Sequence, residues 1–439
     1  MYILNAFHKI TNLIKLYYRR PYFGFINGHA YLSDEEVLEL HSFLGSKNDK
    51  VVESFEESFS GLIGNGKSVS FASGRMGFYV LMQVLGVKAG DEVVLQGATC
   101  SVMANAILRI GATPIYADID PETYGSSAKY IAKVITSKTK VVVAQHSFGI
   151  PCDIEPVLEL TKSRNIFLLE DCALTVGSKL NGVVCGNFGG AALFSTDHSK
   201  PLNTITGGLV YTKDYDLFKS LKEIQKNSQP LSIHKQKALW KQFLFERKYC
   251  RPGKYGKIKL ISAIRSRIGF YKRPFLDDDF GSVPSRGYPY PAKLPTFLAK
   301  LGMFELQQWE HTVQFRKYIL KQLLNIITNP ENESLFSVYH NSATDIVPLR
   351  LVWSEENGEI LRNELANCFD TSGTWFLQPV VATGEPLENF GYHAGTCKIS
   401  ECVGKNMINL PCNFNPEWME SVKYNLVKFF AKKRNVSVI

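Results

Sequence analysis

Apolar and polar positions alternate in a regular way between residues 68 and 212. Seven short runs of apolar or β-branched residues are typical of buried strands: 68–71, 92–95, 114–118, 140–145, 166–170, 191–195 and 208–212. Several of the early intervals show helical periodicity, as at 76–85, 102–110 and 154–163. Strands that alternate with helices form a parallel sheet with helices on both faces. We therefore predict an α/β fold built on a mostly parallel, seven-stranded sheet.

The pattern changes after residue 214. A helix predicted at 215–226 leads into a basic stretch, and 295–324 has the periodicity of one long amphipathic helix. The rest is typical of a smaller α+β domain that ends in a helix near 419–432. We expect an N-terminal segment (1–50) that packs on this second domain, a large domain (51–228), a basic insertion (229–290), and the long helix with the small domain (291–439).

Composition narrows the class of protein. The 439 residues are enough for two domains, and no apolar run approaches the roughly 20 residues that cross a bilayer. The first 25 residues contain no uninterrupted apolar stretch followed by a small-residue cleavage site, which argues against a secretory signal. The nine cysteines are irregularly spaced and form no CxxC pair. This spacing favours a reducing cytoplasm over a disulfide framework or a structural zinc site.

The net charge of +9 is concentrated in two places. Residues 229–276 contain thirteen Lys or Arg and one acid, Glu246, and residues 1–23 contain four Lys or Arg and no acid. Three interpretations of the insertion stay open: it attracts an anionic substrate, it is a solvated face without a partner, or it lies on an anionic membrane together with the N-terminus. No recognised nucleic-acid-binding module accompanies the charge.

Polar residues that carry chemistry follow the predicted strands. Because ligands gather at the carboxyl ends of parallel strands, we expect one site there. The candidates are Ser73, Gly74, Arg75, His146, Asp171, Ser195 and Lys200.

This set matches what a pyridoxal phosphate (PLP) site needs. Such a site has a lysine for the cofactor's aldehyde, an acid beside the pyridine nitrogen, and an anion cup for the phosphate. Lys200 and Asp171 supply the first two, and the turn Ser73–Gly74–Arg75–Met76 before a helix supplies the cup. The pair Gly207–Gly208 permits close approach of the backbone.

The motifs around these residues resemble the DegT/DnrJ/EryC1/StrS family of PLP-dependent sugar aminotransferases. The matching blocks are AGDEV (89–93), TCSVMANA (99–106), ADIDPETY (117–124), HSFG (146–149), EDCA (170–173), GNFG (186–189), FS (194–195) with Lys200 five residues later, Gly207–Gly208 and NLPC (409–412). They cover most of the chain in the family's order. The resemblance implies the aspartate-aminotransferase fold, or fold type I, with its PLP site in the large domain.

It also implies roles for single residues. Lys200 would bind the cofactor and move the proton between the substrate Cα and cofactor C4′, and Asp171 would pair with the pyridine nitrogen. Ser195 and the turn at 73–76 would hold the phosphate, and Cys100 stands where an aromatic often covers the ring. The family further implies a homodimer with shared active sites, in which the partner's Lys226 or Asn227 region reaches the phosphate, and glutamate as amino donor.

Four positions depart from the family pattern. Leu174 replaces a Gln or His, Arg75 replaces a threonine of the phosphate turn, Cys100 replaces the aromatic, and Pro289–Tyr290–Pro291 replaces Asn-Tyr-Arg. Arg75 is either an anion ligand or a structural salt-bridge partner. Cys100 and Cys172 fit small buried residues better than nucleophiles.

Two histidines also have alternative interpretations. His146 is either a residue on the cofactor face or a structural residue at a strand end. His198 lies two positions before Lys200, and related dehydratases carry a histidine in place of the lysine. Because the lysine is present, we interpret His198 as a neighbour of the base.

The function expected from these observations is transfer of an amino group from glutamate to a keto-sugar, nucleotide-linked or a sugar acid, in cell-surface polysaccharide or lipopolysaccharide synthesis. Two alternatives remain open. One is a PLP-dependent sugar dehydratase. The other is a non-catalytic relative that acts as a scaffold, which Leu174 and the basic insertion motivate.

Overall fold

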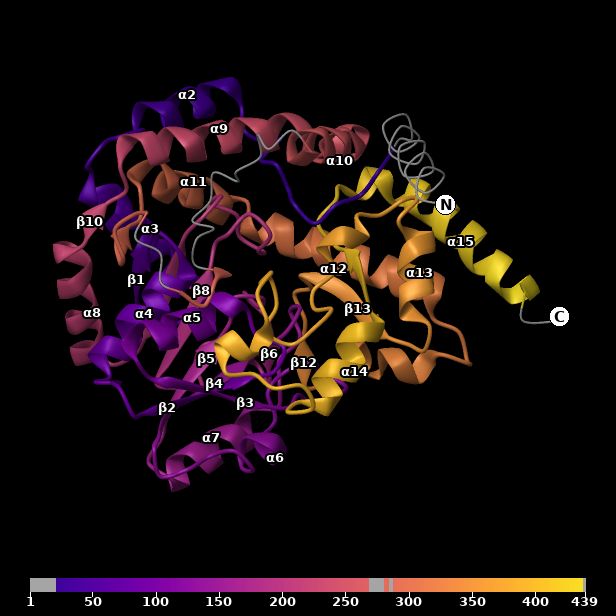
Figure 1. Cartoon of the computed structure of the whole chain (residues 1–439). Helices are drawn as coiled ribbons and strands as arrows, with labels where there is room; N and C mark the ends of the chain where they lie inside the picture. Colours follow the sequence, from indigo (N-terminus) through magenta and orange to yellow (C-terminus); the bar gives the residue numbers. More distant parts are fainter. Residues whose placement is uncertain (1–20, 268–279, 284–286, 437–439) are drawn as a thin grey trace.

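The computed structural model describes residues 21–267, 280–283 and 287–436. Its centre is a seven-stranded sheet of order β1–β9–β8–β5–β4–β2–β3 (Figure 1). The strands are β1 (Lys67–Phe71), β2 (Glu92–Gln96), β3 (Thr113–Ala117), β4 (Thr139–Gln145), β5 (Phe167–Asp171), β8 (Ala191–Ser195) and β9 (Gly208–Thr212). β9 runs antiparallel to both neighbours, whereas the other pairs are parallel. The predicted mostly parallel, seven-stranded α/β sheet is therefore confirmed.

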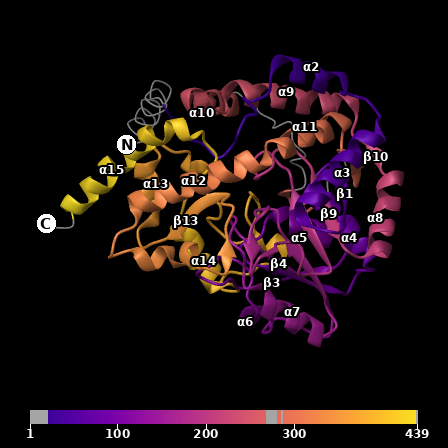
Figure 2. The same ribbon diagram turned by 180° about the vertical axis from the view of Figure 1, so that it is seen from behind.

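Alternate residues of the strands enter two different cores. On β4, Val141 and Val143 face the large core, while Val142 and Ala144 pack with Val157 of α7. Because both faces of these strands are buried, nearly all of their residues are apolar, which explains the continuous apolar runs in the sequence. The helices of this domain are α3 (Asp49–Ile63), α4 (Gly74–Val84), α5 (Ser101–Ile110), α6 (Ala128–Ile131), α7 (Ile154–Ser163) and α8 (Tyr215–Asn227), seen from behind in Figure 2.

The sheet topology brings distant motifs together. β1, β4, β5 and β8 end at one edge of the sheet, and β9 begins there because it is antiparallel. Gly208, the first residue of β9, pairs with Phe71 at the end of β1 and with Ser195 at the end of β8. The predicted turn at 73–76 and the segment after β8 therefore meet at this edge.

The basic insertion leaves and rejoins the body at one place. Short strands β10 (Gln229–Pro230) and β11 (Ala292–Lys293) pair in parallel at its two ends. Between them, α9 (Ile233–Tyr249) and α10 (Pro252–Arg267) lie end to end, with α2 (Asp34–Ser42) alongside α9 (Figure 1). Leu239 and Phe243 of α9 are buried in the large core. The cations at 272 and 273, and those of the first 20 residues, lie outside the described residues.

The prediction of one long helix at 295–324 is wrong, because the helix is interrupted. The structure has two helices, α11 (Thr296–Gln307) and α12 (Trp309–Ile327), separated at Gln308. Leu298 of α11 packs in the large core, whereas Leu323 of α12 packs in the core of the small domain. The chain must turn between these two cores, and an amphipathic pattern on both sides of the turn conceals it.

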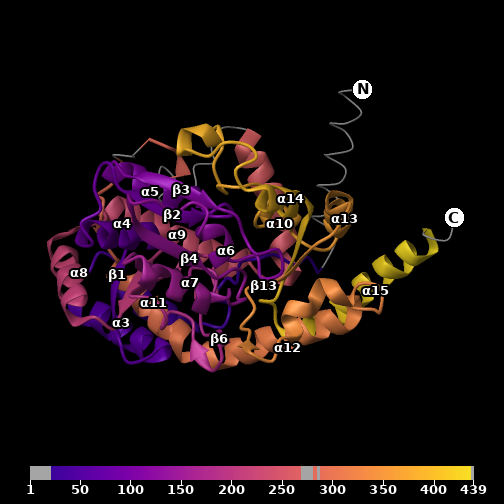
Figure 3. The ribbon, with the colours of Figure 1, turned by 90° about the horizontal axis from the view of Figure 1, so that it is seen from below.

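The small domain is built on β13 (Arg350–Ser354) and β14 (Met407–Pro411), which pair antiparallel. Phe23 of the N-terminal segment packs on its Phe369 and Phe414, while α2 packs on α11. The last helix begins at Met419, as expected, and projects from the body (Figure 3). The other elements are α13 (Gly358–Leu365), α14 (Lys398–Asn406), α15 (Met419–Val436), the small sheet of β6 (Lys179–Leu180), β7 (Val183–Val184) and β12 (Thr344–Asp345), and 3-10 helices Glu333–His340, Thr371–Gly373, Leu387–Phe390 and Pro416–Trp418.

No helix among the described residues is long and apolar enough to cross a membrane.

Candidate active site

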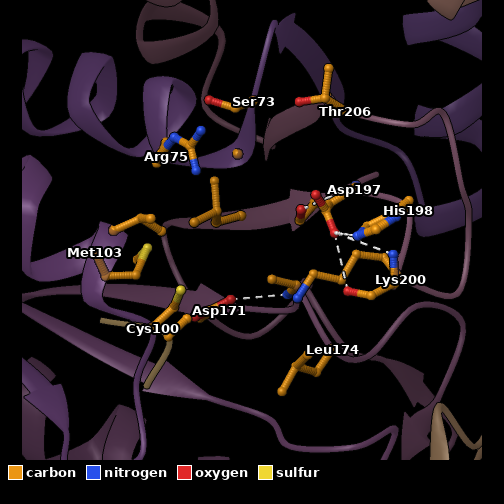
Figure 4. Close-up of a pocket in the computed structure, with 18 of the residues that line it drawn as sticks. Ser73, Arg75, Cys100, Met103, Asp171, Leu174, Asp197, His198, Lys200 and Thr206 are labelled. Atoms are coloured by element: carbon orange, nitrogen blue, oxygen red, sulfur yellow. Dashed lines mark hydrogen bonds and ion pairs between the residues drawn. The ribbon is translucent and has the colours of Figure 1, made fainter. Parts of the chain in front are cut away.

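A cavity of about 230 Å³ opens at the edge where the strands end (Figure 4). Seven of the ten predicted site residues line it: Ser73, Gly74, Arg75, Cys100, Asp171, Ser195 and Lys200. They come from four separate segments of the chain, which the sheet topology brings to one place.

One wall of the cavity is suited to an anion. Ser73 precedes the first turn of α4 in an extended conformation, but its side chain does not cap the helix. Its Oγ is buried and has no hydrogen-bond partner. The helix N-terminus adds backbone amides and a partial positive charge, and Arg75 lies in the first turn. A phosphate at this position would accept the hydrogen bond that the Ser73 hydroxyl lacks.

Glycine is required where β9 begins, next to this wall. A Cβ added to Gly208 would lie 2.3 Å from the Cα of Gly74, closer than any real contact. At Gly207, a Cβ would lie 2.4 Å from Thr196 Oγ1. The pair of glycines therefore lets β9 pass directly behind the anion-binding turn.

The opposite end of the cavity holds a buried acid. Asp171 is the last residue of β5 and is 5% exposed. Its Oδ1 accepts a hydrogen bond of 2.9 Å from the Ala173 amide. Burial raises the pKa of the Asp171 carboxyl, while the Ala173 amide, Lys200 and His146 oppose that rise. A cationic ring nitrogen in the cavity would compensate for the lost solvation of this carboxylate.

Lys200 lies in the loop after β8 and faces the same cavity (Figure 4). Its backbone amide donates to the carbonyl of Asp197, which closes a tight turn before the lysine. Its Nζ lies 5.5 Å from the centre of the Trp375 ring. The amine and the Asp171 carboxylate are thus presented to one small volume.

The cavity wall between the acid and the anion cup is apolar. Cys100 and Met103, from the start of α5, line it, and Leu174 lines the cavity on the side of Asp171 away from Ser73 (Figure 4). Burial raises the pKa of the Cys100 thiol, so the sulfur is neutral at physiological pH. Soft sulfur atoms therefore occupy the position of the expected aromatic.

Three predicted residues do not line the cavity. His146 is fully buried, with its Nε2 3.1 Å from Glu170 Oε2 and its Nδ1 accepting from the Cys152 amide. The prediction of a role on the cofactor face is corrected: both ring nitrogens are engaged inside the protein. Met76 is fully buried, and its sulfur accepts from the Ala292 amide. Asn227 is exposed at the end of α8.

Other lining residues were not predicted from the sequence. Trp375 comes from the small domain, and Phe280 comes from the end of the basic insertion, where its ring lies 5.3 Å from the Arg75 guanidinium. Asp197 and Thr206, which stand before and after Lys200 in the sequence, also line the cavity. No sequence signal marks Trp375 or Phe280, because each is far in the chain from the motifs it meets.

The residues present fit PLP. The buried Ser73 hydroxyl without a partner, the glycines behind the turn, and the buried Asp171 carboxylate match the phosphate and the pyridine nitrogen of this cofactor. Lys200 lies with them and offers a primary amine. The α/β fold and the lining of this cavity together are typical of PLP-dependent proteins.

Comparison with known proteins identifies the family. Residues 33–423 match the DegT/DnrJ/EryC1/StrS aminotransferase family, and the chain belongs to it.

Curated relatives match the chain over part of their length. GDP-perosamine synthase from Escherichia coli O157:H7 is 36% identical over 191 residues, which are 44% of this chain and 52% of that protein. The spore coat polysaccharide biosynthesis protein SpsC from Bacillus subtilis is 33% identical over 211 residues, 48% of this chain and 52% of SpsC. The chain spans about half the length of the curated relatives it matches.

Solved structures share the fold over nearly the whole chain. Helicobacter pylori PseC, an aminotransferase involved in the biosynthesis of pseudoaminic acid, superposes with a TM-score of 0.68 at 18% identity, covering 94% of this chain and 100% of PseC. S. venezuelae DesV superposes with a TM-score of 0.68 at 19% identity, covering 94% and 98%. Both comparisons show the aminotransferase fold.

Proposed function

We propose that this protein is a PLP-dependent aminotransferase that moves an amino group from glutamate to a keto-sugar in cell-surface polysaccharide synthesis, including that of lipopolysaccharide. The observation that carries the proposal is the meeting of Lys200, Asp171 and the anion cup at Ser73 in one cavity. Membership of the aminotransferase family supports the reaction type. Relatives named for amino-sugar synthesis, such as GDP-perosamine synthase, support the substrate class.

The proposal gives each side chain a task. When bound, PLP supplies an electron sink that makes the proton on the carbon bearing the amine removable. Ser73, Ser195, Arg75 and the first amides of α4 would hold the phosphate, and Asp171 would keep the ring nitrogen protonated. Lys200 would hold the cofactor through its amine and, once released, take the proton from Cα of the amino donor.

A second cavity of about 690 Å³ would receive the sugar. Lys200 lines it as well as the first cavity, so both meet at the proposed base. Arg251 and Lys254, from the junction of α9 and α10, line it together with Arg316 of α12. With Lys200, these cations outnumber the two acids of the lining, Glu305 and Glu417. The excess of positive charge favours the first interpretation of the basic insertion, recognition of an anionic substrate such as a nucleotide-linked sugar. These residues belong to the same subunit as Lys200, whereas the proposed phosphate contact of Asn227 would come from the partner subunit.

The proposal includes a cytoplasmic homodimer with shared active sites. All nine cysteines are free thiols, which fits a reducing compartment. A contact between Asn227 of one subunit and the phosphate site of the other would require the dimer. Sedimentation or light scattering of the purified protein tests the subunit number.

The experiment that tests the function follows the nitrogen atom. Protein loaded with PLP is incubated with ¹⁵N-glutamate and candidate nucleotide-linked 4-keto-sugars, and the products are identified by mass spectrometry. The proposal predicts 2-oxoglutarate and a sugar that carries ¹⁵N. Release of the label as ammonia with loss of a sugar hydroxyl would instead identify a dehydratase. Failure to take up PLP at all would favour the scaffold.

A further inference from the structure

The acid of the basic insertion does not lie on its surface. Glu246 is the one acid among residues 229–276, and its side chain is fully buried on α9. Its Oε1 lies 2.8 Å from Nδ1 of His198 and accepts a second hydrogen bond of 2.7 Å from Gln242 Nε2. Its Oε2 is buried without a hydrogen-bond partner. A buried carboxylate is costly unless a cation compensates for it, and the imidazole of His198 is positioned to do so.

His198 in turn belongs to the loop that carries Lys200. Its side chain is 19% exposed and lines the cavity that contains Lys200 and Asp171. An ionised Glu246 can only accept a hydrogen bond, so this contact assigns a proton to Nδ1 and fixes the orientation of the ring. Nε2 lies 3.9 Å from Asp197 Oδ1. The charged groups near the imidazole include Glu246 from α9 and Asp197 from its own loop, and Lys200 lies near Asp197.

Anchoring of α9 does not require this pair. Leu239 and Phe243 of the same helix are already buried in the large core. The pair thus places an acid-base group, with a buried carboxylate behind it, at the edge of the proposed active site. A histidine oriented by a carboxylate is a common general acid-base arrangement.

We propose that His198, positioned by Glu246, transfers the protons that accompany exchange between a carbonyl oxygen and an amine nitrogen in this active site. The inference rests on the proposed function. When an amine condenses with the keto group, a C=N bond replaces the C=O bond, and the oxygen leaves as water with two hydrogens that came from the nitrogen. The imidazolium gives a proton to the departing oxygen, and the imidazole recovers one from the nitrogen, so no proton is consumed.

This role is separate from that of Lys200. Lys200 moves the proton on the Cα carbon, whereas His198 transfers protons to and from the oxygen and the nitrogen. Release of 2-oxoglutarate from the glutamate side runs the same exchange in reverse, with water as the reactant. Both halves of the reaction therefore need His198, but removal of the glutamate Cα proton does not.

The test separates these two proton transfers. PLP-loaded wild type, H198Q and E246Q are incubated with glutamate in D₂O, and the exchange of the Cα hydrogen and the release of 2-oxoglutarate are followed by NMR. For H198Q we expect release to fall about 100-fold, as for loss of a general acid-base group, with Cα exchange changed less than about twofold. Q242A is the control, because it removes a neighbouring hydrogen bond to Glu246 and leaves His198 in place.

The E246Q variant tests the inference independently, through the pH dependence of 2-oxoglutarate release. Removal of the buried negative charge makes the imidazolium easier to deprotonate, so the fall of the release rate with rising pH should move to lower pH. ¹⁵N NMR without substrate should show the titration of the His198 ring moving to lower pH by the same amount. If the contact between Glu246 and His198 were only structural, the ring titration and the rate profile would not have to move together. Equal losses of Cα exchange and release in H198Q, or an unmoved profile in E246Q, would overturn the inference. If wild type exchanges no Cα hydrogen, the proposed function itself fails.

Discussion

Gly208 and Gly74 touch through their backbones: a Cβ on Gly208 would lie 2.3 Å from the Gly74 Cα and 2.4 Å from its nitrogen. The first residue of β9 therefore supports the turn that begins α4, where the anion cup lies. In the proposed function, this contact would couple the packing of the sheet to the binding of the cofactor's phosphate.

Replacement of Gly208 by alanine tests that coupling. The new methyl group displaces the turn at Gly74, so we expect loss of about 2 kcal/mol of stability, as for other overpacked sites, together with much weaker PLP binding. Urea unfolding and PLP titration measure the two effects. Gly61→Ala is the control, because a Cβ there meets no atom within 4 Å. Normal PLP affinity in a folded Gly208→Ala protein would contradict the coupling.

Ser73→Ala should weaken cofactor binding without weakening the cofactor-free fold. The Ser73 Oγ makes no hydrogen bond, so its removal costs the folded chain nothing, whereas a bound phosphate loses one charge-assisted donor. A loss of about 2 kcal/mol corresponds to roughly a 30-fold weaker PLP affinity. Ser101→Ala is the matched control, since Ser101 Oγ is also buried without a partner but lies outside the cavity lining. Equal effects of the two substitutions would place the phosphate elsewhere.

Cys100 should report occupancy of the cavity. Burial raises the pKa of its thiol, so the reactive thiolate is scarce at pH 7 and alkylation should accelerate only at distinctly alkaline pH. Iodoacetamide labelling followed by mass spectrometry measures this in the cofactor-free protein, with exposed Cys402 as the reference thiol. Bound PLP should protect Cys100 and leave Cys402 unaffected. Unchanged labelling of Cys100 on PLP binding would mean that the cofactor does not cover it.

The cations of the insertion should contribute to substrate binding. Arg251 and Lys254 line the second cavity, whereas Lys237 is exposed on α9 outside it. Replacement of both lining cations by alanine should raise KM for a nucleotide-linked keto-sugar about tenfold, because two partly screened charge interactions are lost. The kcat should change little, and Lys237→Ala should match wild type. Steady-state kinetics at two salt concentrations provides the comparison. An unchanged KM would instead support the interpretation of the insertion as a solvated face without a partner.

The sheet was predictable from the sequence because its strands are buried on both faces. Such strands are short, continuous apolar runs, as at 140–145, and the structure places β4 at Thr139–Gln145. The break at Gln308 was not predictable, since both helices beside it are amphipathic and only their different cores require the turn. Boundaries that depend on tertiary packing leave no trace in a local pattern.

The site was predictable where residues follow strands, and less so elsewhere. His146 follows β4 directly, but the residue turns inward to Glu170, a choice that strand order alone cannot reveal. Phe280 and Trp375 enter the cavity from remote segments. Glu246 had a signal of another kind: a single acid within a basic stretch indicates a specific partner, although the sequence does not name it.

The central claim, that Lys200 and Asp171 act on one bound PLP, is tested most directly by absorbance. Purified wild type should develop the visible band of lysine-bound PLP, and addition of glutamate should replace it with the near-ultraviolet band of the aminated cofactor. Lys200→Ala should bind PLP without developing the lysine-bound band, while Lys237→Ala, at an exposed position on α9, should behave as wild type in this respect. An unaltered lysine-bound band in Lys200→Ala would contradict the account.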